Sequence, residues 1–133
     1  MTETSERRVR GQQVLAEIGT ALGPGRERYP HLPREQAEHV IDTLVDYCFG
    51  DTWARPGSAI DLRTRRLLTI AATLAMGRER QLRAHINGAL GQGISLEEVV
   101  ETINHLIPYC GFPAGLTALD IANEVAAARA GKA

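Results

Sequence analysis

The sequence has few of the residues on which several classes of protein depend. Its 133 residues include two cysteines and one tryptophan, and aromatic residues make up 5% of the total. The 15 lysine and arginine residues are balanced by 16 aspartate and glutamate residues, which gives a formal net charge of -1. Because no excess of positive charge is present to attract a polyanion, we expect no nucleic-acid partner.

Long apolar runs are also absent. The longest run is far too short to cross a bilayer, so we expect no membrane partner. The opening segment, MTETSERRVRGQQ, is polar and charged and has no apolar stretch of signal-peptide length. These features predict a cytoplasmic protein.

The two cysteines, Cys48 and Cys110, lie far apart in the sequence. They form no C-x-x-C pair and match no metal-ligand spacing, so we predict no metal site. A disulfide between them stays possible, but a cytoplasmic location favours two reduced and mostly packed thiols.

The apolar residues recur with helical spacing, and no run alternates with period two, so the sequence predicts an all-α fold. We expect a single domain over residues 1–133 with six helices joined by short connections. The expected helices cover 4–21, 33–50, 62–76, a segment that holds His85 and ends at 91–93, 95–111 and 113–130. Asp61 and the S-L-E-E capping box at 95–98 are expected to begin two of them. From residue 67 to 76 the third of these helices is apolar apart from Thr69 and Thr73, so we expect it to be buried nearly all round.

His85 interrupts the buried stripe of its helix. Leu82, Ile86, Ala89 and Leu90 recur at the spacing of an amphipathic helix, and His85 occupies a position where another leucine would pack. Two interpretations stay open from this pattern alone. The ring is either a hydrogen-bonded core histidine or a pocket residue whose pKa near neutrality suits a general acid or base.

Cationic and aromatic residues precede that helix. In W-A-R-P-G, Trp53 offers a flat apolar wall, and Arg55 offers a planar guanidinium that can bind a carboxylate through two hydrogen bonds. An interface tryptophan beside a surface arginine explains the pattern at least as well. In L-R-T-R-R-L-L, the run of Arg63, Arg65 and Arg66 is expected to form mainly a solvated face, with ligand binding by Arg65 or Arg66 as the alternative.

His105 shares a helical face with Glu101 and Tyr109, at spacings of four residues. This set favours a polar contact across an oligomer interface over a proton relay. The sequence contains no Gly-rich phosphate loop, nucleophile elbow or H-E-x-x-H motif.

The order of these motifs resembles the carboxymuconolactone decarboxylase family over about residues 50–125, whereas the helices expected within 4–49 fit more loosely. The matching pieces are R-P-G (55–57), D-L-R-T-R (61–65), Q-L-R-A-H (81–85), A-L-x-x-G (89–93), S-L-E-E-V-V-E (95–101) and Y-C-G-F-P-A (109–114). The resemblance implies an alkyl hydroperoxidase D-like helical bundle that assembles into homo-oligomers, trimers or hexamers, with sites near subunit contacts.

The resemblance also separates two branches of the family. The redox branch carries C-x-x-C one turn before the histidine that matches His85, and here Arg78 and Gln81 occupy those positions. Many redox members also have a glutamate where this chain has Arg66. Since thiol–disulfide chemistry needs a second sulfur nearby, the decarboxylase branch is favoured.

That branch implies a cofactor-free decarboxylase acting on a carboxylated lactone such as 4-carboxymuconolactone, in the protocatechuate and 3-oxoadipate catabolism of aromatic compounds. We predict His85 as general acid or oxyanion donor and Arg55 as carboxylate anchor. The predicted substrate-binding residues are Trp53, Arg65, His105 and Tyr109. The alternatives are a related decarboxylase, isomerase or cyclase acting on a natural-product intermediate, and a non-catalytic helical oligomer.

Overall fold

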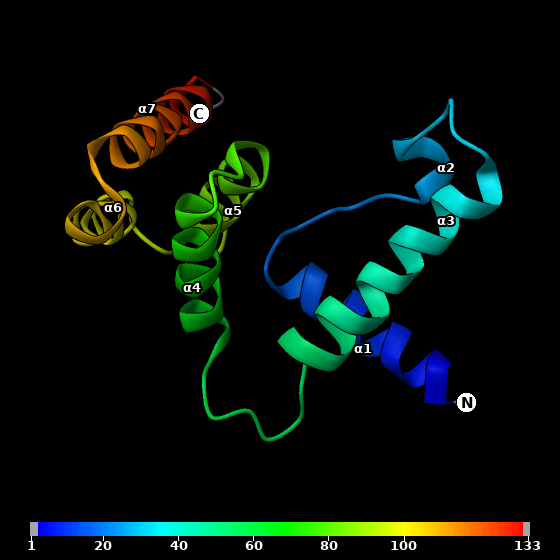
Figure 1. The fold of residues 1–133 in the computed structure, drawn as a ribbon. Coiled ribbons are helices and arrows are strands. Elements are labelled where there is room, and N and C mark those ends of the chain that lie inside the picture. The colour runs from blue at the N-terminus through cyan, green and yellow to red at the C-terminus, as the bar shows by residue number, and fades with distance from the viewer. Residues whose placement is uncertain (1–2, 132–133) are drawn as a thin grey trace. The chain divides into compact units, whose positions relative to one another are not determined.

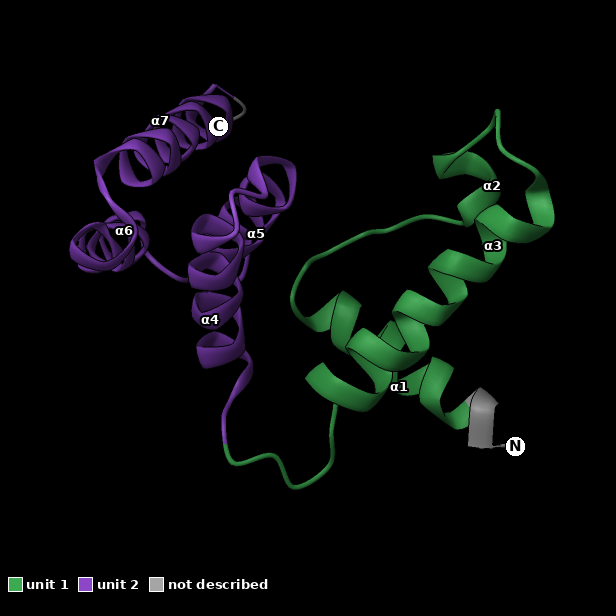
Figure 2. Ribbon diagram, in the orientation of Figure 1, with its two compact units in different colours: residues 1–59 green, residues 60–133 purple. Residues whose placement is uncertain are grey.

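Helices account for the regular secondary structure of the computed structural model, which describes residues 3–131 (Figure 1). Seven α-helices and one π-helix lie in that range, so the all-α prediction is confirmed. The helices form two compact units, Met1–Ala59 and Ile60–Ala133, which Figure 2 colours separately. Within residues 3–131, no helix combines the length and apolar character needed to cross a membrane.

Unit 1 is built around the contact between its first and last helices. It comprises α1 (Glu3–Glu17), α2 (Gly25–Arg28), α3 (Arg34–Thr43) and the π-helix η1 (Leu44–Trp53). Helices α1 and η1 approach so closely that a Cβ atom on Gly11 would lie 2.3 Å from the carbonyl oxygen of Val45. A Cβ on Gly50 would lie 2.4 Å from the carbonyl oxygen of Arg7. Two glycines therefore let the backbones of the two helices meet.

Two arginine–aspartate pairs hold the same contact together. Arg8 donates two hydrogen bonds to the buried carboxylate of Asp46, at 2.6 and 2.8 Å, and Arg7 donates two to Asp51, at 2.9 and 2.6 Å. The bonds from Arg8 hold the pKa of Asp46 below its usual value. Bidentate pairs of this kind fix orientation as well as adding energy, so they set how α1 lies on η1.

Three predictions for unit 1 are wrong. Helix α1 ends at Glu17 rather than near residue 21, because Gly19 adopts a left-handed φ of 68°. The expected loop at 26–32 begins with a short helix, α2. The helix expected to stop at Gly50 continues to Trp53 as η1, because Gly50 serves the close approach of α1 rather than a helix end.

Unit 2 contains the helices α4 (Leu62–Ala75), α5 (Glu79–Gly91), α6 (Leu96–Cys110) and α7 (Phe112–Ala130). The predicted starts are confirmed: the Asp61 carboxylate accepts from the Thr64 amide at 2.8 Å, and Ser95 and Glu98 form the capping box. Gly111, with φ of 93°, ends α6. The four helices enclose one apolar core, made by Ile70, Leu74, Leu82, Ile86, Ala89, Ile94, Val99, Ile103, Ala118, Ile121, Ala122 and Val125.

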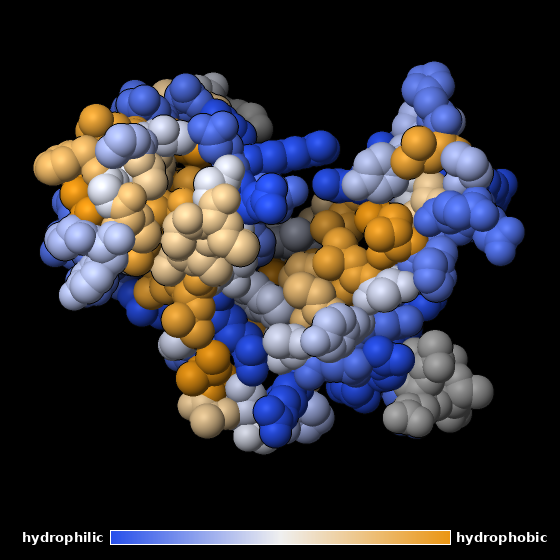
Figure 3. All heavy atoms as spheres, in the orientation of Figure 1, coloured by the Kyte–Doolittle hydropathy of each residue, from blue (hydrophilic) through white to orange (hydrophobic). Residues whose placement is uncertain are grey.

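Helix α4 is not buried all round, contrary to the expectation from its apolar residues 67–76. Its buried stripe is Arg66, Ile70, Thr73 and Leu74, whereas Leu68 is 55% exposed. Other large apolar side chains of unit 2 are exposed as well. Figure 3 shows apolar residues on the surface among polar ones. The exposed large apolar residues of unit 2 are Ile60, Leu68, Met76, Leu96, Tyr109, Phe112 and Leu116.

The glycine contact of unit 1 can be tested with Gly11→Ala. The added methyl group would meet the η1 backbone, which cannot rotate away, so we expect a loss of about 1–3 kcal/mol in the free energy of unfolding despite the better helix propensity of alanine. Urea denaturation followed by circular dichroism measures it. Gly91→Ala is the matched control, because the nearest atom to its Cβ lies 3.8 Å away. Equal stability of the two variants would contradict the close approach.

Candidate functional site

His85 lies on α5 at the edge of the core. Its neighbours on the stripe, Leu82, Ile86 and Ala89, are buried as predicted, whereas His85 itself is half-buried. The helical stripe therefore places the ring where one side faces the packed interior. The protonation of the ring depends on the groups that contact it on that interior side.

The partner of His85 is Arg66 on α4, which is only 1% exposed. Nη1 of Arg66 lies 2.8 Å from Nδ1 of His85, and Nε of Arg66 donates to Oε1 of Gln92 at 3.1 Å. A guanidinium has donors and no acceptor, so Nδ1 of the ring must be the acceptor. The ring proton consequently lies on Nε2. The sequence prediction of a solvated cation is wrong for Arg66.

Gly88 makes room for this guanidinium. It lies one turn beyond His85 on α5, and a Cβ atom there would stand 2.7 Å from Cζ, Nη1 and Nη2 of Arg66. Any larger residue at position 88 would occupy the space of the cation. The guanidinium of Arg66 on α4 is thus surrounded by three residues of α5 and its C-terminal end, namely His85, Gly88 and Gln92.

Both groups have a lowered pKa in these surroundings. Burial, and secondarily the charge of Arg66, lowers the pKa of His85 to about 4. Burial also lowers the pKa of Arg66, although a guanidinium stays charged at neutral pH. The interpretation of His85 as a group with a pKa near neutrality is therefore wrong. At neutral pH the ring is uncharged, and its polar hydrogen is Nε2–H.

The other cations of the run have separate surroundings. Arg63 is exposed and forms an ion pair with Glu98 of α6, so it fits the predicted solvated face. Arg65 is half-buried. Its role as a substrate-binding residue stays a prediction.

His105 and Tyr109 lie together on α6, as their spacing predicts. Their ring centroids are 5.5 Å apart, with a tilt of 44° between the planes. Both are exposed, and Tyr109 is 78% exposed. Their assignment to substrate binding stays a prediction.

Trp53 and Arg55 belong to unit 1. Trp53 ends η1 and is 7% exposed, with its ring centroid 5.8 Å from that of Phe49. Arg55 is exposed in the segment that follows η1. The pairing of Arg55 with His85 in one site stays a prediction.

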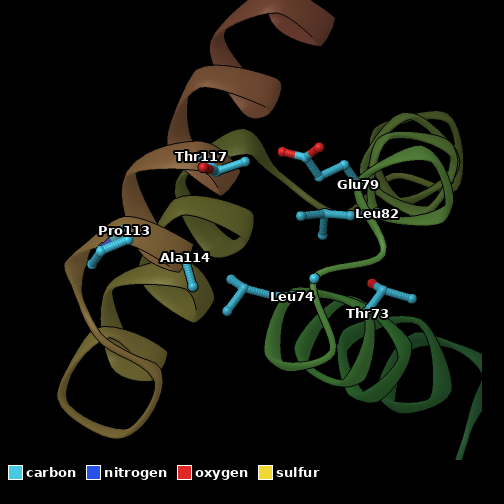
Figure 4. Close-up of a pocket in the computed structure, with 8 residues that line it drawn as sticks. Thr73, Leu74, Glu79, Leu82, Pro113, Ala114 and Thr117 are labelled. Carbon is cyan, nitrogen blue, oxygen red and sulfur yellow. The ribbon is translucent and has the colours of Figure 1, made fainter.

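A hollow of about 230 Å³ opens within unit 2, between the turn that joins α4 to α5 and the start of α7 (Figure 4). It is lined by Thr73, Leu74, Gly77, Glu79, Leu82, Pro113, Ala114 and Thr117. Among the described residues, its lining includes none of the predicted site residues. Its walls are mainly apolar, so it offers volume but few polar groups.

Cys48 and Cys110 are both free thiols. Both are half-buried, and burial raises the pKa of the Cys48 thiol, which makes the reactive thiolate scarcer. Across residues 3–131, no three histidine, cysteine, aspartate or glutamate side chains gather closely enough to hold a metal ion.

The sequence carried a signal for Arg66 that charge alone concealed. Arg66, Ile70, Thr73 and Leu74 recur at the spacing of a buried helical stripe, which marks Arg66 as an inward-facing cation. Gln92 had no comparable signal, because its side chain acts from the end of α5. The prediction of one solvated face for the three arginines therefore holds for Arg63 and fails for Arg66.

Comparisons with known proteins agree with the motif order. The sequence profile of the carboxymuconolactone decarboxylase family matches residues 38–124. The chain is 40% identical to 4-carboxymuconolactone decarboxylase of Acinetobacter baylyi over 79 residues, which are 59% of this chain and 58% of that protein. It is 28% identical to nitrosuccinic acid decarboxylase npaB of Metarhizium robertsii over 83 residues, which are 62% of this chain and 57% of that protein.

A third relative extends over more of the chain. It is an uncharacterized 15.0 kDa protein from the nqo9–nqo10 intergenic region of Paracoccus denitrificans, 35% identical over 120 residues, or 86% of this chain and 88% of that protein. The chain spans less than two thirds of the length of either named decarboxylase. The family match covers well over half of the chain and includes the whole Arg66–His85–Gln92 cluster. The chain therefore belongs to the carboxymuconolactone decarboxylase family.

Proposed function

We propose that the protein is a cofactor-free decarboxylase that acts on a carboxylated lactone of the 4-carboxymuconolactone kind, in the catabolism of aromatic compounds through protocatechuate and 3-oxoadipate. The observation that carries the proposal is the contact of Arg66 with His85, which makes the histidine a neutral donor with its proton on Nε2. The 40% identity to a 4-carboxymuconolactone decarboxylase supports the substrate class.

The reaction calls for a donor of this kind. The bond between the substrate carbon and its carboxylate breaks, CO2 leaves, and the electron pair stays on carbon and spreads through a double bond to the lactone carbonyl oxygen. A hydrogen bond to that oxygen becomes stronger as the negative charge develops, so it stabilises the transition state more than the ground state. A proton taken from solvent water then adds to that carbon, so hydrogen replaces the departed CO2. The substrate supplies its own electron sink, and the donor role goes to Nε2–H of His85.

A neutral imidazole suits this role better than that of general acid. With a pKa of about 4, only about one His85 ring in a thousand carries a second proton at pH 7. A neutral ring donates a hydrogen bond without transferring the proton. Of the two roles predicted for His85, we therefore propose the oxyanion donor.

Two further residues, Arg55 and Trp53, are proposed to contact the substrate. The exposed guanidinium of Arg55 anchors a substrate carboxylate through two hydrogen bonds, and Trp53 forms an apolar wall. Arg65, His105 and Tyr109 serve as further substrate-binding residues. We propose a homo-oligomer, trimeric or hexameric and cytoplasmic, and the exposed apolar side chains of unit 2, including Leu68, support subunit contacts.

The second candidate function is decarboxylation of a different carboxylate, such as a natural-product intermediate. The similarity to nitrosuccinic acid decarboxylase supports it. A nitro group can accept the electron pair left by CO2 as a lactone carbonyl does, and in both substrates the charge develops on oxygen. The same histidine donor would serve both reactions, so the substrate has to be found by assay. A non-catalytic oligomer is the outcome if neither class of substrate reacts.

Purified protein incubated with 4-carboxymuconolactone should release CO2 and change the ultraviolet absorbance of the lactone, whereas nitrosuccinic acid should react slowly or not at all. His85→Ala should lower kcat about 10²–10³-fold, because the transition-state donor is lost. Full turnover by a folded His85→Ala protein would remove His85 from the reaction. Turnover of nitrosuccinic acid alone would favour the second candidate.

The pH dependence separates a donor from an acid. If His85 is a neutral donor, the ratio of the wild-type rate to the His85→Ala rate should stay constant from about pH 8 down to pH 5.5. The ratio should fall only as the pH approaches about 4. There the ring gains a proton, and Nδ1 can no longer accept a hydrogen bond from Arg66. A ratio that falls steadily as the pH rises above 5 would instead indicate that His85 acts as the acid.

Arg55→Met should raise KM about 10–100-fold and change kcat less, because one charge-assisted bidentate contact to the substrate is lost. Arg55→Lys should recover part of the loss, since the charge remains without the fork. Arg34→Met is the control, as Arg34 is an exposed arginine of α3 that pairs with Glu38. An unchanged KM for Arg55→Met would exclude Arg55 as the anchor.

A further inference from the structure

We propose that Arg66 is a positioning residue for the decarboxylation: its buried guanidinium fixes the orientation and tautomer of His85 and places a positive charge behind the ring, which strengthens Nε2–H as the donor to the developing oxyanion. This inference rests on the proposed function and deepens it, since it explains how an uncharged histidine can act as a strong donor.

The orientation follows from how completely the guanidinium is held. Arg66 is 1% exposed, its Nη1 meets His85 at 2.8 Å, and its Nε donates to Gln92 at 3.1 Å. Gly88 leaves no spare room, because a Cβ there would lie 2.7 Å from three guanidinium atoms. A side chain fixed at several points has lost its rotamer freedom before the substrate binds, so the ring it contacts is preorganised.

The tautomer follows from the chemistry of the two groups. Neutral histidine can carry its proton on either ring nitrogen, and the two tautomers donate in different directions. Since Arg66 only donates, a proton on Nδ1 would face an N–H of the guanidinium and break the contact. The pair therefore selects the Nε2–H tautomer, which is the form that points a donor away from Arg66.

The charge is transmitted through the ring. Nδ1 of His85 and Oε1 of Gln92 are neutral acceptors, so the hydrogen bonds to these two atoms leave the positive charge of Arg66 in place. Hydrogen bonds in series polarise one another, and the effect is larger at a buried position of low dielectric. The charge of Arg66 draws electron density toward Nδ1 and makes Nε2–H more positive. Burial of the ring and, secondarily, the charge of Arg66 lower the pKa of His85.

Two substitutions outside the pair separate the positioning effect from the charge effect. Gly88→Ala places a methyl group where the guanidinium lies. Because the guanidinium is the flexible end of a long side chain, we expect the guanidinium to shift while the fold persists. Gln92→Glu retains an acceptor for Nε of Arg66 but adds a negative charge, so the contact with His85 should persist while the charge is cancelled. Gly91→Ala on the same helix is the matched control, with no atom nearer than 3.8 Å.

The measurements are nitrogen-15 NMR of the His85 ring and the rate of CO2 release from 4-carboxymuconolactone. In the wild type and Gly91→Ala we expect one tautomer, Nε2–H, and equal rates. Gly88→Ala should show both tautomers and lower kcat at least tenfold. Gln92→Glu should keep the Nε2–H tautomer, raise the pKa of His85 and lower kcat several-fold with little change in KM.

A single Nε2–H tautomer in Gly88→Ala at the wild-type rate would overturn the positioning role, and an unchanged kcat in Gln92→Glu would overturn the charge effect. The failure of the proposed function is distinguishable from both. If the wild type releases no CO2, the proposed function fails, whereas the NMR comparison of wild type with Gly88→Ala still decides whether Arg66 controls the tautomer of His85.

Discussion

The burial of one cation, Arg66, is the constraint on which the centre of unit 2 depends. Removing a guanidinium from water costs several kcal/mol unless its donors find partners. His85 and Gln92 provide acceptors at 2.8 and 3.1 Å, and Gly88 provides the space. Because these partners come from α5 and its end, satisfying the cation also fixes how α4 lies on α5. The same contacts decide the tautomer of His85.

The two units are stabilised by different means. In unit 2 the four helices share an apolar core, and a buried cation interrupts it at one point. In unit 1 the main contact is backbone against backbone at Gly11 and Gly50, framed by two arginine–aspartate pairs. At Gly11 and Gly50 an added Cβ atom would meet backbone, whereas at Gly88 in unit 2 it would meet the end of a flexible side chain. We therefore expect alanine at Gly11 or Gly50 to destabilise the fold more than alanine at Gly88.

Under the proposed function, one histidine position would serve different chemistry in the two branches of the family. The motif order relates His85 to a histidine that follows C-x-x-C in the redox branch, where sulfur carries the reaction. Here Arg78 and Gln81 replace the thiols and Arg66 contacts the ring. A cation beside an imidazole opposes its protonation, which suits a neutral hydrogen-bond donor. The exchange of thiols for arginine and glutamine is thus consistent with chemistry that stabilises negative charge on oxygen.

The sequence by itself determined the helices that have a strong local cause: Asp61 and the Ser95–Glu98 box begin α4 and α6, Gly111 ends α6, and the Leu82–Ile86–Ala89 stripe faces the core. It also determined the family, through motif order. Only the tertiary structure decided that Gly50 continues a helix and that Arg66 is buried against His85, because both depend on contacts between residues distant in sequence. The protonation of His85 depends on its surroundings in the same way, since burial and a neighbouring charge set a pKa.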